Sequence, residues 1–388
     1  MGSMRSAVIV GGGIGGLAAA LALHRTGWAV TVLERAPQIR EVGAGLTIME
    51  NGLSCLDELG VGDDIRQASL LQPPAIRRWD GRWLVRATGA VATRIGTVGM
   101  HRAELHRILL EALPPEAVRT DAAVVAVAAG SPAVVRYRGS NAEGEIATDL
   151  VVAADGIRST VRAQLWPEVP APVYGGTTAW RAVTAEPWTG SEVLGFSWAP
   201  GTEFGMGPMV DGRAFWYLAV NAPPGTRHSD DLGAVRSLVG NWHDPIPGLL
   251  AATDPAAVLP DDIYRLAVHP RSFVRGPVVL LGDAAHAMLP TLGQGAGQAL
   301  EDAVVLAAEL ARDGSISAAL AAYDRARRPR ARRVADLARL SGRLGQRLTN
   351  PALIGLRNTA YRALPPSITI GSLGAVTDWR APALSPSA

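Results

Sequence analysis

Residues near the amino terminus have the types and spacing needed to bind the pyrophosphate of a dinucleotide. Residues 11–16 read Gly-Gly-Gly-Ile-Gly-Gly and fit the pattern G-x-G-x-x-G, with Gly11, Gly13 and Gly16 at its fixed positions. Gly11 permits a tight turn, Gly13 lets backbone N–H groups approach a phosphate, and Gly16 lets a helix pack closely against a strand. The start of that helix provides a favourable field for an anion.

An acidic residue further along the chain supports this interpretation. Glu34 follows an apolar run at about the expected spacing of roughly 20 residues, where a carboxylate accepts hydrogen bonds from ribose hydroxyls. A carboxylate there disfavours the 2′-phosphate of NADP, and Arg35 beside it could lie against an adenine or a phosphate. The pattern alone does not distinguish FAD from NAD.

The elements around these residues predict an α/β fold. Residues 6–10 and 28–33 are strand-like and residues 17–25 are helical, which together form a βαβ unit. Short strand-like runs between residues 177 and 220, joined through turn signals such as Asp211-Gly212, predict an antiparallel sheet. An apolar strand returns at residues 278–281 and is followed by helical stretches at about 298–310 and 317–348. The nucleotide-binding domain is therefore predicted to be discontinuous.

Two further segments identify the kind of dinucleotide site. Residues 155–162 read Asp-Gly-Ile-Arg-Ser-Thr-Val-Arg, and residues 282–286 read Gly-Asp-Ala-Ala-His, followed by Pro290 and Gly293-Gln294-Gly295. With residues 11–16, these segments resemble the three signature motifs of the group A flavin-dependent monooxygenases, the family of para-hydroxybenzoate, salicylate and urate hydroxylases. The resemblance extends from about residue 6 to about residue 340. Below, residues 11–16, 155–162 and 282–295 are called the first, second and third motifs.

The resemblance implies a particular domain organisation. It predicts a Rossmann-like FAD-binding domain of the glutathione-reductase type, an inserted antiparallel-sheet substrate domain and C-terminal helices. The FAD-binding domain is expected at residues 4–75, 98–171 and 276–315. The substrate domain is expected at residues 76–97 and 172–275, and the helical region at residues 316–380.

The resemblance also assigns residues to the cofactor. Asp283 would bind a ribityl hydroxyl, while Gly293 and Gly295 would present backbone N–H groups to the pyrimidine edge of the flavin. Arg102, at the start of a helix, would reach the flavin phosphates. The residues expected at FAD are Gly11, Gly13, Ile14, Gly15, Gly16, Glu34, Arg35, Gly45, Arg102, Val125, Asp155, Gly156, Gly282, Asp283, Pro290, Gly293, Gln294 and Gly295.

The implied reaction is insertion of one oxygen atom into a small aromatic or polycyclic substrate. In the family's scheme NADH or NADPH reduces FAD, O₂ adds at the flavin C4a position, and the hydroperoxide hydroxylates or epoxidises the substrate. No second G-x-G-x-x-G follows a strand, so the nicotinamide cofactor is expected to dock transiently. The sequence does not distinguish NADH from NADPH.

Substrate and catalytic residues are less well marked by the sequence. Arg181 could anchor a carboxylate or phenolate, or could pair with Glu203 across the sheet. Arg181 and Pro290 are the catalytic candidates, whereas His286 is interpreted as a packing or hydrogen-bonding residue. Glu203 and Phe215 stand where urate hydroxylases carry Arg and Tyr, which counts against urate. The residues expected to line the substrate pocket are Arg181, Met206, Phe215, Trp216 and Leu292.

Other flavin chemistries are alternatives to hydroxylation. A flavin-dependent oxidase or desaturase, or a non-catalytic flavin redox sensor, would use the same cofactor motifs. The flavin-dependent halogenases need a Lys and a Trp-x-Trp-x-Ile-Pro segment. This chain has neither the segment nor a Lys, and all 37 residues in its Lys and Arg count are Arg.

Composition restricts the other classes of protein to which this chain could belong. The 388 residues carry a net charge of +2 and a single cysteine, Cys55, so an intrachain disulfide is impossible and no Cys cluster can bind a metal. No apolar run reaches the roughly 20 residues that span a bilayer. The arginine run at residues 325–333 lies in a predicted helix, and we expect no nucleic-acid partner. A cytoplasmic location is expected, and the oligomeric state is not indicated.

Overall fold

A computed structural model describes most of the chain. The described residues are 4–38, 45–73, 75–87, 97–140, 143–312, 314–365 and 374–384. Parts of the predicted domains, among them residues 39–44, 88–96 and 366–373, lie outside the described residues.

A six-stranded sheet forms the centre of the nucleotide-binding unit. Its strand order is β18-β19-β12-β1-β2-β8, and β19, β12, β1, β2 and β8 run parallel. Their carboxyl ends therefore meet at one edge, where ligands bind in open α/β sheets. The strands are β1 (Ser6–Val10), β2 (Ala29–Leu33), β8 (Val118–Arg119), β12 (Leu150–Ala153), β18 (Val274–Arg275) and β19 (Val278–Leu280).

Small residues let helices pack closely on this sheet. The Ala-rich helix α1 (Ile14–Arg25) is buried along most of its length and contacts α10 (Gly295–Ala311). A three-stranded antiparallel sheet, β9 (Ala123–Ala128), β10 (Ala133–Arg138) and β11 (Glu143–Thr148), also packs on the unit. Further helices complete it: α2 (Glu50–Glu58), α3 (Gly62–Gln67), α5 (Arg102–Glu111), α6 (Thr160–Leu165) and α9 (Asp283–His286).

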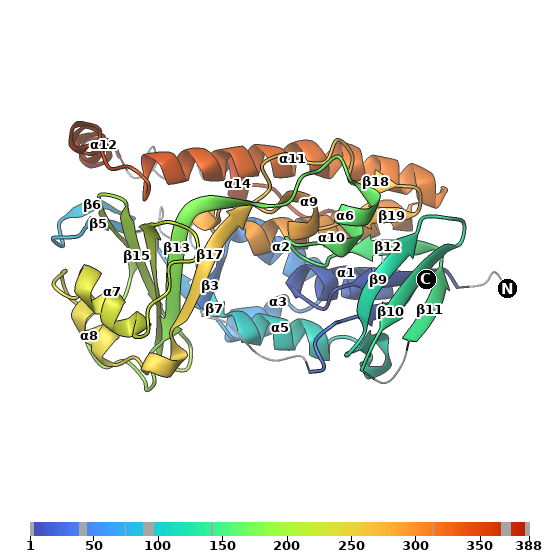
Figure 1. The fold of residues 1–388 in the computed structure, drawn as a ribbon, viewed down its shortest axis with the longest axis horizontal. Helices are drawn as coiled ribbons and strands as arrows, with labels where there is room; N and C mark the ends of the chain where they lie inside the picture. Colours follow the sequence, from blue (N-terminus) through green and yellow to red (C-terminus); the bar gives the residue numbers. More distant parts are fainter. Residues whose placement is uncertain are drawn as a thin grey trace.

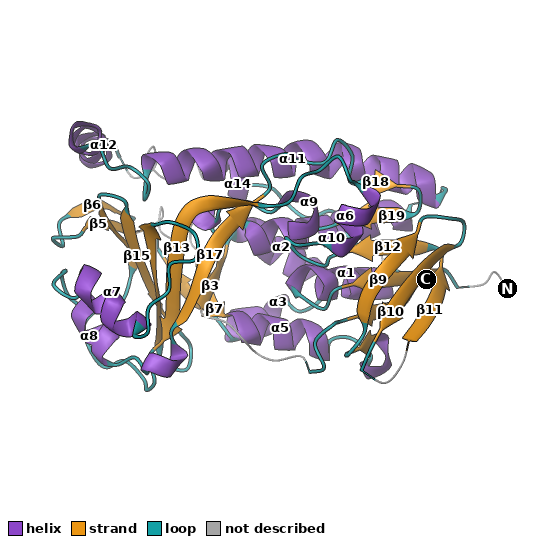
Figure 2. Cartoon of the chain, viewed as in Figure 1, coloured by secondary structure: helices purple, strands orange, loops and turns teal. Residues whose placement is uncertain are grey.

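A seven-stranded sheet forms the second unit. Its order is β17-β13-β16-β15-β14-β5-β6, so strands from both segments predicted for the substrate domain share one sheet. Helices α7 (Asp231–Val239) and α8 (Ile246–Ala251) lie on its side away from the nucleotide-binding unit, as Figures 1 and 2 show. The strands are β5 (Ala75–Arg78), β6 (Trp83–Arg86), β13 (Val173–Val183), β14 (Gly195–Ala199), β15 (Thr202–Pro208), β16 (Ala214–Asn221) and β17 (Leu259–Arg265).

The alternation of side chains gives this sheet two different faces. One face forms a buried apolar cluster with α7 and α8, and this face contains Trp180, Ala182, Phe204, Met206, Trp216 and Leu218. We call the opposite face, which carries Arg181, Glu203, Phe215 and Tyr217, the inner face. It is turned toward the nucleotide-binding unit.

Two elements connect the units. The sheet of β3 (Gly45–Ile48), β7 (Thr97–His101) and β4 (Leu70–Gln72) lies between them. Helix α11 (Ile316–Leu344) runs along both units and is followed by α12 (Pro351–Ala363), as Figure 1 shows; a short helix, α14 (Gly374–Thr377), comes later. Among the described helices, none is long and apolar enough to cross a membrane.

A buried ionic cluster joins α10 to α11. Arg327, from the arginine run of α11, pairs with Glu301 and lies 2.7 Å from Asp302 (Nε to Oδ1), and all three side chains are buried. Arg330 adds a second ion pair to Glu301 at 2.5 Å. Burial by itself raises the pKa of Asp302, but the charges of His286 and Arg327 and the hydrogen bonds outweigh it and lower that pKa. Part of the arginine run is therefore structural.

Replacing Arg327 tests this cluster. Arg327→Met keeps much of the volume but removes the fully buried cation that both carboxylates share, leaving Arg330 as the arginine paired with Glu301. The loss should lower the free energy of unfolding by about 3–5 kcal/mol. Urea unfolding of the two proteins measures the difference. Arg339→Met removes an exposed ion pair to Asp336 on the same helix and should cost less than about 1 kcal/mol. Equal, small effects of both substitutions would contradict the structural role of Arg327.

Candidate active site

The three sequence motifs meet at the carboxyl edge of the six-stranded sheet. The first motif follows β1, the second follows β12, and the third follows β19. These strands are neighbours in the order β19-β12-β1, with parallel pairing throughout. Segments far apart in the sequence therefore form one continuous surface.

The glycines of the first motif are required by close packing. Gly11 has φ +103°, and a Cβ atom on it would lie 2.6 Å from the carbonyl oxygen of Ala154. A Cβ atom on Gly16 would lie 1.9 Å from the carbonyl oxygen of Gly11. Gly15 is similarly close to Leu281. These contacts join the first motif to the strands that carry the other two.

Glu34 lies beside the first motif, as predicted. Its Oε2 accepts a hydrogen bond of 2.7 Å from the Gly12 N–H, and its Oε1 accepts one of 2.9 Å from the Ala36 N–H. Both oxygens keep further lone pairs for ribose hydroxyls. The neighbouring Arg35 is exposed.

The second motif is tied to the third by Arg162. The Arg162 guanidinium is buried and donates a 2.8 Å hydrogen bond to the carbonyl oxygen of Ala284 and another to that of Ile157. Asp155 accepts a hydrogen bond from the Val161 N–H through Oδ2 (3.1 Å). Arg162 thus holds two motifs together.

Charged groups gather around Asp283. Its side chain reaches solvent, yet desolvation by the surrounding protein raises the pKa of its carboxyl, opposed by His286, Arg102 and Arg162. Desolvation and the charge of Arg181 lower the pKa of Arg102, which Asp283 raises. Arg102 is therefore within electrostatic reach of both Arg181 and Asp283, although the three residues come from α5, β13 and α9.

The rest of the third motif forms a loop before α10. Pro290 opens a short 3-10 turn, η3 (Pro290–Leu292), and is exposed, while Leu292 is partly buried. Gly293 has φ +62° and lies near Thr47 of β3. The Gln294 side chain is buried and its Oε1 accepts a 2.9 Å hydrogen bond from Asn51. Only the backbone of Gln294 is thus available to a ligand.

The carboxyl edge has the features that FAD requires. A Cβ atom on Gly13, Gly156 or Gly295 would meet no other atom within 4 Å, so backbone borders open space at one point of every motif. Asp155 Oδ1 is buried and has no hydrogen-bond partner among the described residues. The amino terminus of α1 adds unpaired N–H groups and a favourable field for phosphate. These residues fit a bound dinucleotide.

The inner face of the second sheet carries flat aromatic side chains. A Cβ atom on Gly205 would lie 2.1 Å from the ring of Tyr217, and one on Gly45 would lie 2.2 Å from the ring of Phe215. The glycines therefore let both rings lie close against the backbone. Phe196, 37% exposed, continues this surface with its ring centre 6.3 Å from that of Tyr217. We call Phe196, Phe215 and Tyr217 the aromatic platform.

Several predicted pocket residues occupy different positions. The prediction that Met206 and Trp216 line the pocket is corrected. Both side chains point to the face opposite the inner face, where they are buried against α7 and α8. Arg181 is on the inner face but pairs with Asp261 of β17 at 2.5 Å, and not with Glu203. Phe215 lies on the inner face and is buried. Val125, which was expected at FAD, is 48% exposed on β9.

Glu203 is the residue of the inner face that sequence reasoning missed. Its Oε1 accepts a 2.7 Å hydrogen bond from the hydroxyl of Tyr217, and its Oε2 accepts one of 2.5 Å from the indole N–H of Trp198. The alternation of large apolar residues at 204, 206, 216 and 218 could have placed it on this face.

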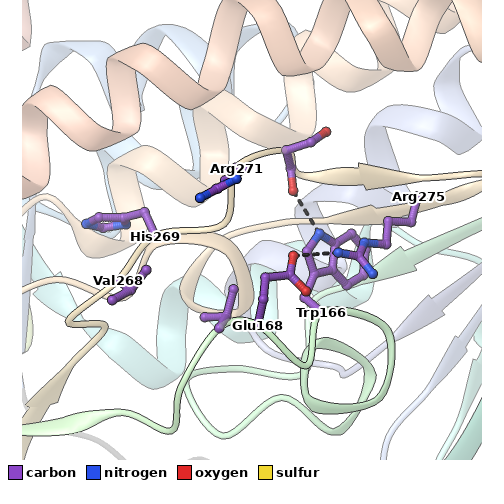
Figure 3. A pocket seen from close by; sticks show the side chains of 8 residues that line it. Trp166, Glu168, Val268, His269, Arg271 and Arg275 are labelled. Carbon is purple, nitrogen blue, oxygen red and sulfur yellow. Dashed lines mark hydrogen bonds and ion pairs between the residues drawn. The ribbon is translucent and has the colours of Figure 1, made fainter.

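A cavity of about 520 Å³ lies elsewhere, between the end of α6 and the segment before β18 (Figure 3). Trp166 donates a 2.8 Å hydrogen bond to the carbonyl oxygen of Ser272, and Arg275 pairs with Glu168 at 2.5 Å while its guanidinium lies over the Trp166 ring. This cavity contributes no residue to the carboxyl edge or to the aromatic platform.

Comparison with known proteins gives consistent matches over nearly the whole chain. Residues 4–338 match the family model described as "FAD binding domain". Aurachin C monooxygenase/isomerase of Stigmatella aurantiaca is 37% identical over 351 residues, covering 87% of this chain and 88% of that protein. The 2-heptyl-3-hydroxy-4(1H)-quinolone synthase of Pseudomonas aeruginosa is 33% identical, covering 92% of this chain and 94% of that protein.

Structural comparison agrees. The crystal structure of Klebsiella pneumoniae HpxO complexed with FAD and uric acid has a TM-score of 0.87 and 26% identity, covering 96% of this chain and 96% of that chain. The expected fold class is thereby confirmed.

Asp283→Ala tests the cofactor site. The substitution removes an acceptor predicted to bind a ribityl hydroxyl, so FAD affinity should fall about tenfold or more, while the fold is retained. Flavin absorbance per protein after dialysis measures occupancy, and circular dichroism measures the fold. Asp63→Ala, which removes an exposed carboxylate from the start of α3, is the control and should keep full occupancy. Full occupancy in Asp283→Ala would exclude this role for Asp283.

Proposed function

Because this chain belongs to the FAD-binding family of aromatic monooxygenases, we propose that it uses NADH or NADPH and O₂ to hydroxylate a planar, bicyclic nitrogen heteroaromatic of the quinolone type. The family match over residues 4–338 and the relative at 37% identity establish the membership. The aromatic platform is the observation that carries the proposed substrate class.

The family recognised from the three motifs is confirmed, and so are the binding of FAD and the activity of a monooxygenase that hydroxylates aromatic substrates. The nicotinamide donor, the substrate and the individual site residues belong to the proposal.

In this proposal, different site residues bind different parts of FAD. Backbone N–H groups at Gly13 and the start of α1 bind the pyrophosphate, Glu34 binds the ribose of the adenosine, and Asp283 binds the ribityl chain. Arg102 neutralises phosphate charge, and backbone groups at Gly293 and Gly295 orient the flavin ring. Bound FAD supplies the redox chemistry, in which the nicotinamide provides two electrons and O₂ provides one oxygen atom for the substrate and one for water.

The aromatic platform favours a flat substrate. Phe196 and Tyr217 have partly exposed rings on the inner face of the sheet, whereas Phe215 is buried against Gly45 of β3. Exposed aromatic rings bind planar aromatic molecules by stacking and apolar burial. Two relatives have names that refer to aurachin C and to a 4(1H)-quinolone, and they cover most of this chain. A bicyclic heteroaromatic satisfies both observations.

A substrate panel tests this function. With FAD-loaded protein, 4(1H)-quinolones should stimulate aerobic oxidation of NADH or NADPH, and the product should gain the mass of one oxygen atom. Simple phenols and salicylate are the comparison compounds. Oxidation that yields hydrogen peroxide alone with every compound would move the assignment to an oxidase.

Arg181→Ala tests the positioning of the flavin and substrate. Because Arg181 lies on the inner face within electrostatic reach of Arg102, its loss should weaken substrate-stimulated flavin reduction by about tenfold and change FAD occupancy less. Stopped-flow absorbance measures reduction. Arg213→Ala, which removes an exposed arginine at the β15–β16 turn, is the matched control. Unchanged reduction in Arg181→Ala would remove Arg181 from the site.

A further inference from the structure

We propose that Glu203 and Tyr217 form the polar end of the substrate site, and that Glu203 accepts the proton of a ring N–H during hydroxylation. This inference rests on the proposed function and specifies its substrate as a neutral hydrogen-bond donor. It adds a catalytic residue that the sequence motifs do not include.

The carboxylate of Glu203 is held in a fixed orientation. Tyr217 donates to Oε1 at 2.7 Å and Trp198 donates to Oε2 at 2.5 Å. Trp198 is itself fixed, because the Arg357 guanidinium lies 4.6 Å from its ring centre and the Tyr361 ring packs edge-on at 5.8 Å. A carboxylate oxygen can accept more than one hydrogen bond, so Glu203 can still bind a substrate donor.

Contacts at both ends of the inner face join it to the two elements that also border the third motif. Toward one end, Phe215 packs on Gly45 of β3; toward the other, Trp198 packs on Gly345 at the end of α11. The η3 loop lies between the same two elements, since Gly293 is near Thr47 of β3 and Thr291 is near Gly342 of α11. Between those ends, Gly205 of β15 pairs with Tyr217 of β16. Glu203 lies two residues further along β15, where it pairs with Trp198 of β14.

The charges around Glu203 suit a proton acceptor. Burial raises the pKa of its carboxyl, and the hydrogen bonds from Tyr217 and Trp198 and the charge of Arg357 lower it. Burial and the charge of Glu203 raise the pKa of Tyr217, which therefore stays a protonated donor. The groups that act on Glu203 are thus Tyr217 on β16, Trp198 on β14 and Arg357 on α12, while Tyr361 of α12 packs on Trp198. A raised pKa strengthens Glu203 as a base near neutral pH.

An acidic residue at this position selects the substrate by charge. An aromatic carboxylate would place a second negative charge beside Glu203, which is costly where both are desolvated. A neutral ring N–H instead supplies the donor that the carboxylate can accept. An N-methylated ring lacks this donor and leaves the carboxylate unpaired, which costs affinity.

The proton transfer balances within the proposed reaction. The substrate N–H bond breaks, the proton passes to Glu203, and the electron pair remains on the nitrogen and is delocalised to a conjugated ring carbon. That carbon forms a C–O bond to one oxygen atom of O₂ as the O–O bond breaks. The other oxygen atom leaves as water and takes up the proton that the carbon loses, while Glu203 returns its proton to the nitrogen. The oxidant is the one already named in the proposed function.

Binding measurements test the recognition step without turnover. The probes are 4(1H)-quinolone, N-methyl-4-quinolone and salicylate, titrated into FAD-loaded protein with the flavin spectrum as the signal. We expect 4(1H)-quinolone to bind about tenfold or more tightly than the other two, and Glu203→Leu to abolish this preference. Equal binding of the two quinolones by the wild-type protein would overturn the inference, even if both are hydroxylated.

Kinetic measurements test the proton transfer. Glu203→Gln keeps a hydrogen-bond acceptor but no base, so kcat should fall about a hundredfold while KM changes little. The acidic limb of the wild-type pH–kcat profile, where Glu203 becomes protonated, should disappear. Glu192→Gln, an exposed glutamate of the same unit, is the matched control and should retain wild-type values.

The outcomes separate this inference from the proposed function. Wild-type kcat and pH profile in Glu203→Gln would exclude Glu203 as the base and leave the monooxygenase assignment intact. If the wild-type protein neither binds nor hydroxylates any quinolone, both the inference and the proposed substrate class fail. FAD occupancy and the unfolding midpoint of each variant establish that it is folded.

Discussion

The arrangement of the site depends on the interaction of two adjacent carboxylates of α10, Glu301 and Asp302, with Arg327 of α11. Asp302 accepts hydrogen bonds from the Gly282 N–H at 2.9 Å and from His286 at 2.6 Å, so it holds the turn that presents Asp283. Glu301 accepts a 2.7 Å hydrogen bond from Asn51, which in turn donates to Gln294, the residue between Gly293 and Gly295. Arg327 supplies the buried counter-charge for both acids. One cluster therefore fixes both ends of the third motif and attaches α11 to it.

A second constraint is the two-sided nature of the inserted sheet. Alternate side chains along each strand point to the face that packs against α7 and α8, and on this face they are large and apolar. The opposite face is free to carry glycines, flat rings and a carboxylate, because it faces the nucleotide-binding unit and not a helix layer. Strand β3 and helix α11 border both this face and the η3 loop. We therefore expect the nucleotide-binding unit and the inserted sheet each to contribute residues to one site.

The cofactor half of the site was predictable because its residues are dictated by backbone geometry. Gly11 and Gly16 leave no room for a side chain, and the chain order strand, glycine turn, helix is visible in the sequence. The substrate half was not, since β16 reads Ala-Phe-Trp-Tyr-Leu and is apolar on both faces. Without alternation in polarity along β16, Trp216 could not be separated from Phe215. The partners of Arg181 and Glu203 depend on strand order, which no local pattern specifies.

We expect an aromatic substrate to lie between the third motif and the inner face of the sheet, with its ring nitrogen at Glu203. A crystal structure of the FAD-loaded protein with bound 4(1H)-quinolone tests this placement. The ring should lie against Phe196 and Tyr217, with its nitrogen within hydrogen-bonding distance of Glu203. Density for FAD at the carboxyl edge together with the quinolone bound away from this platform would contradict it.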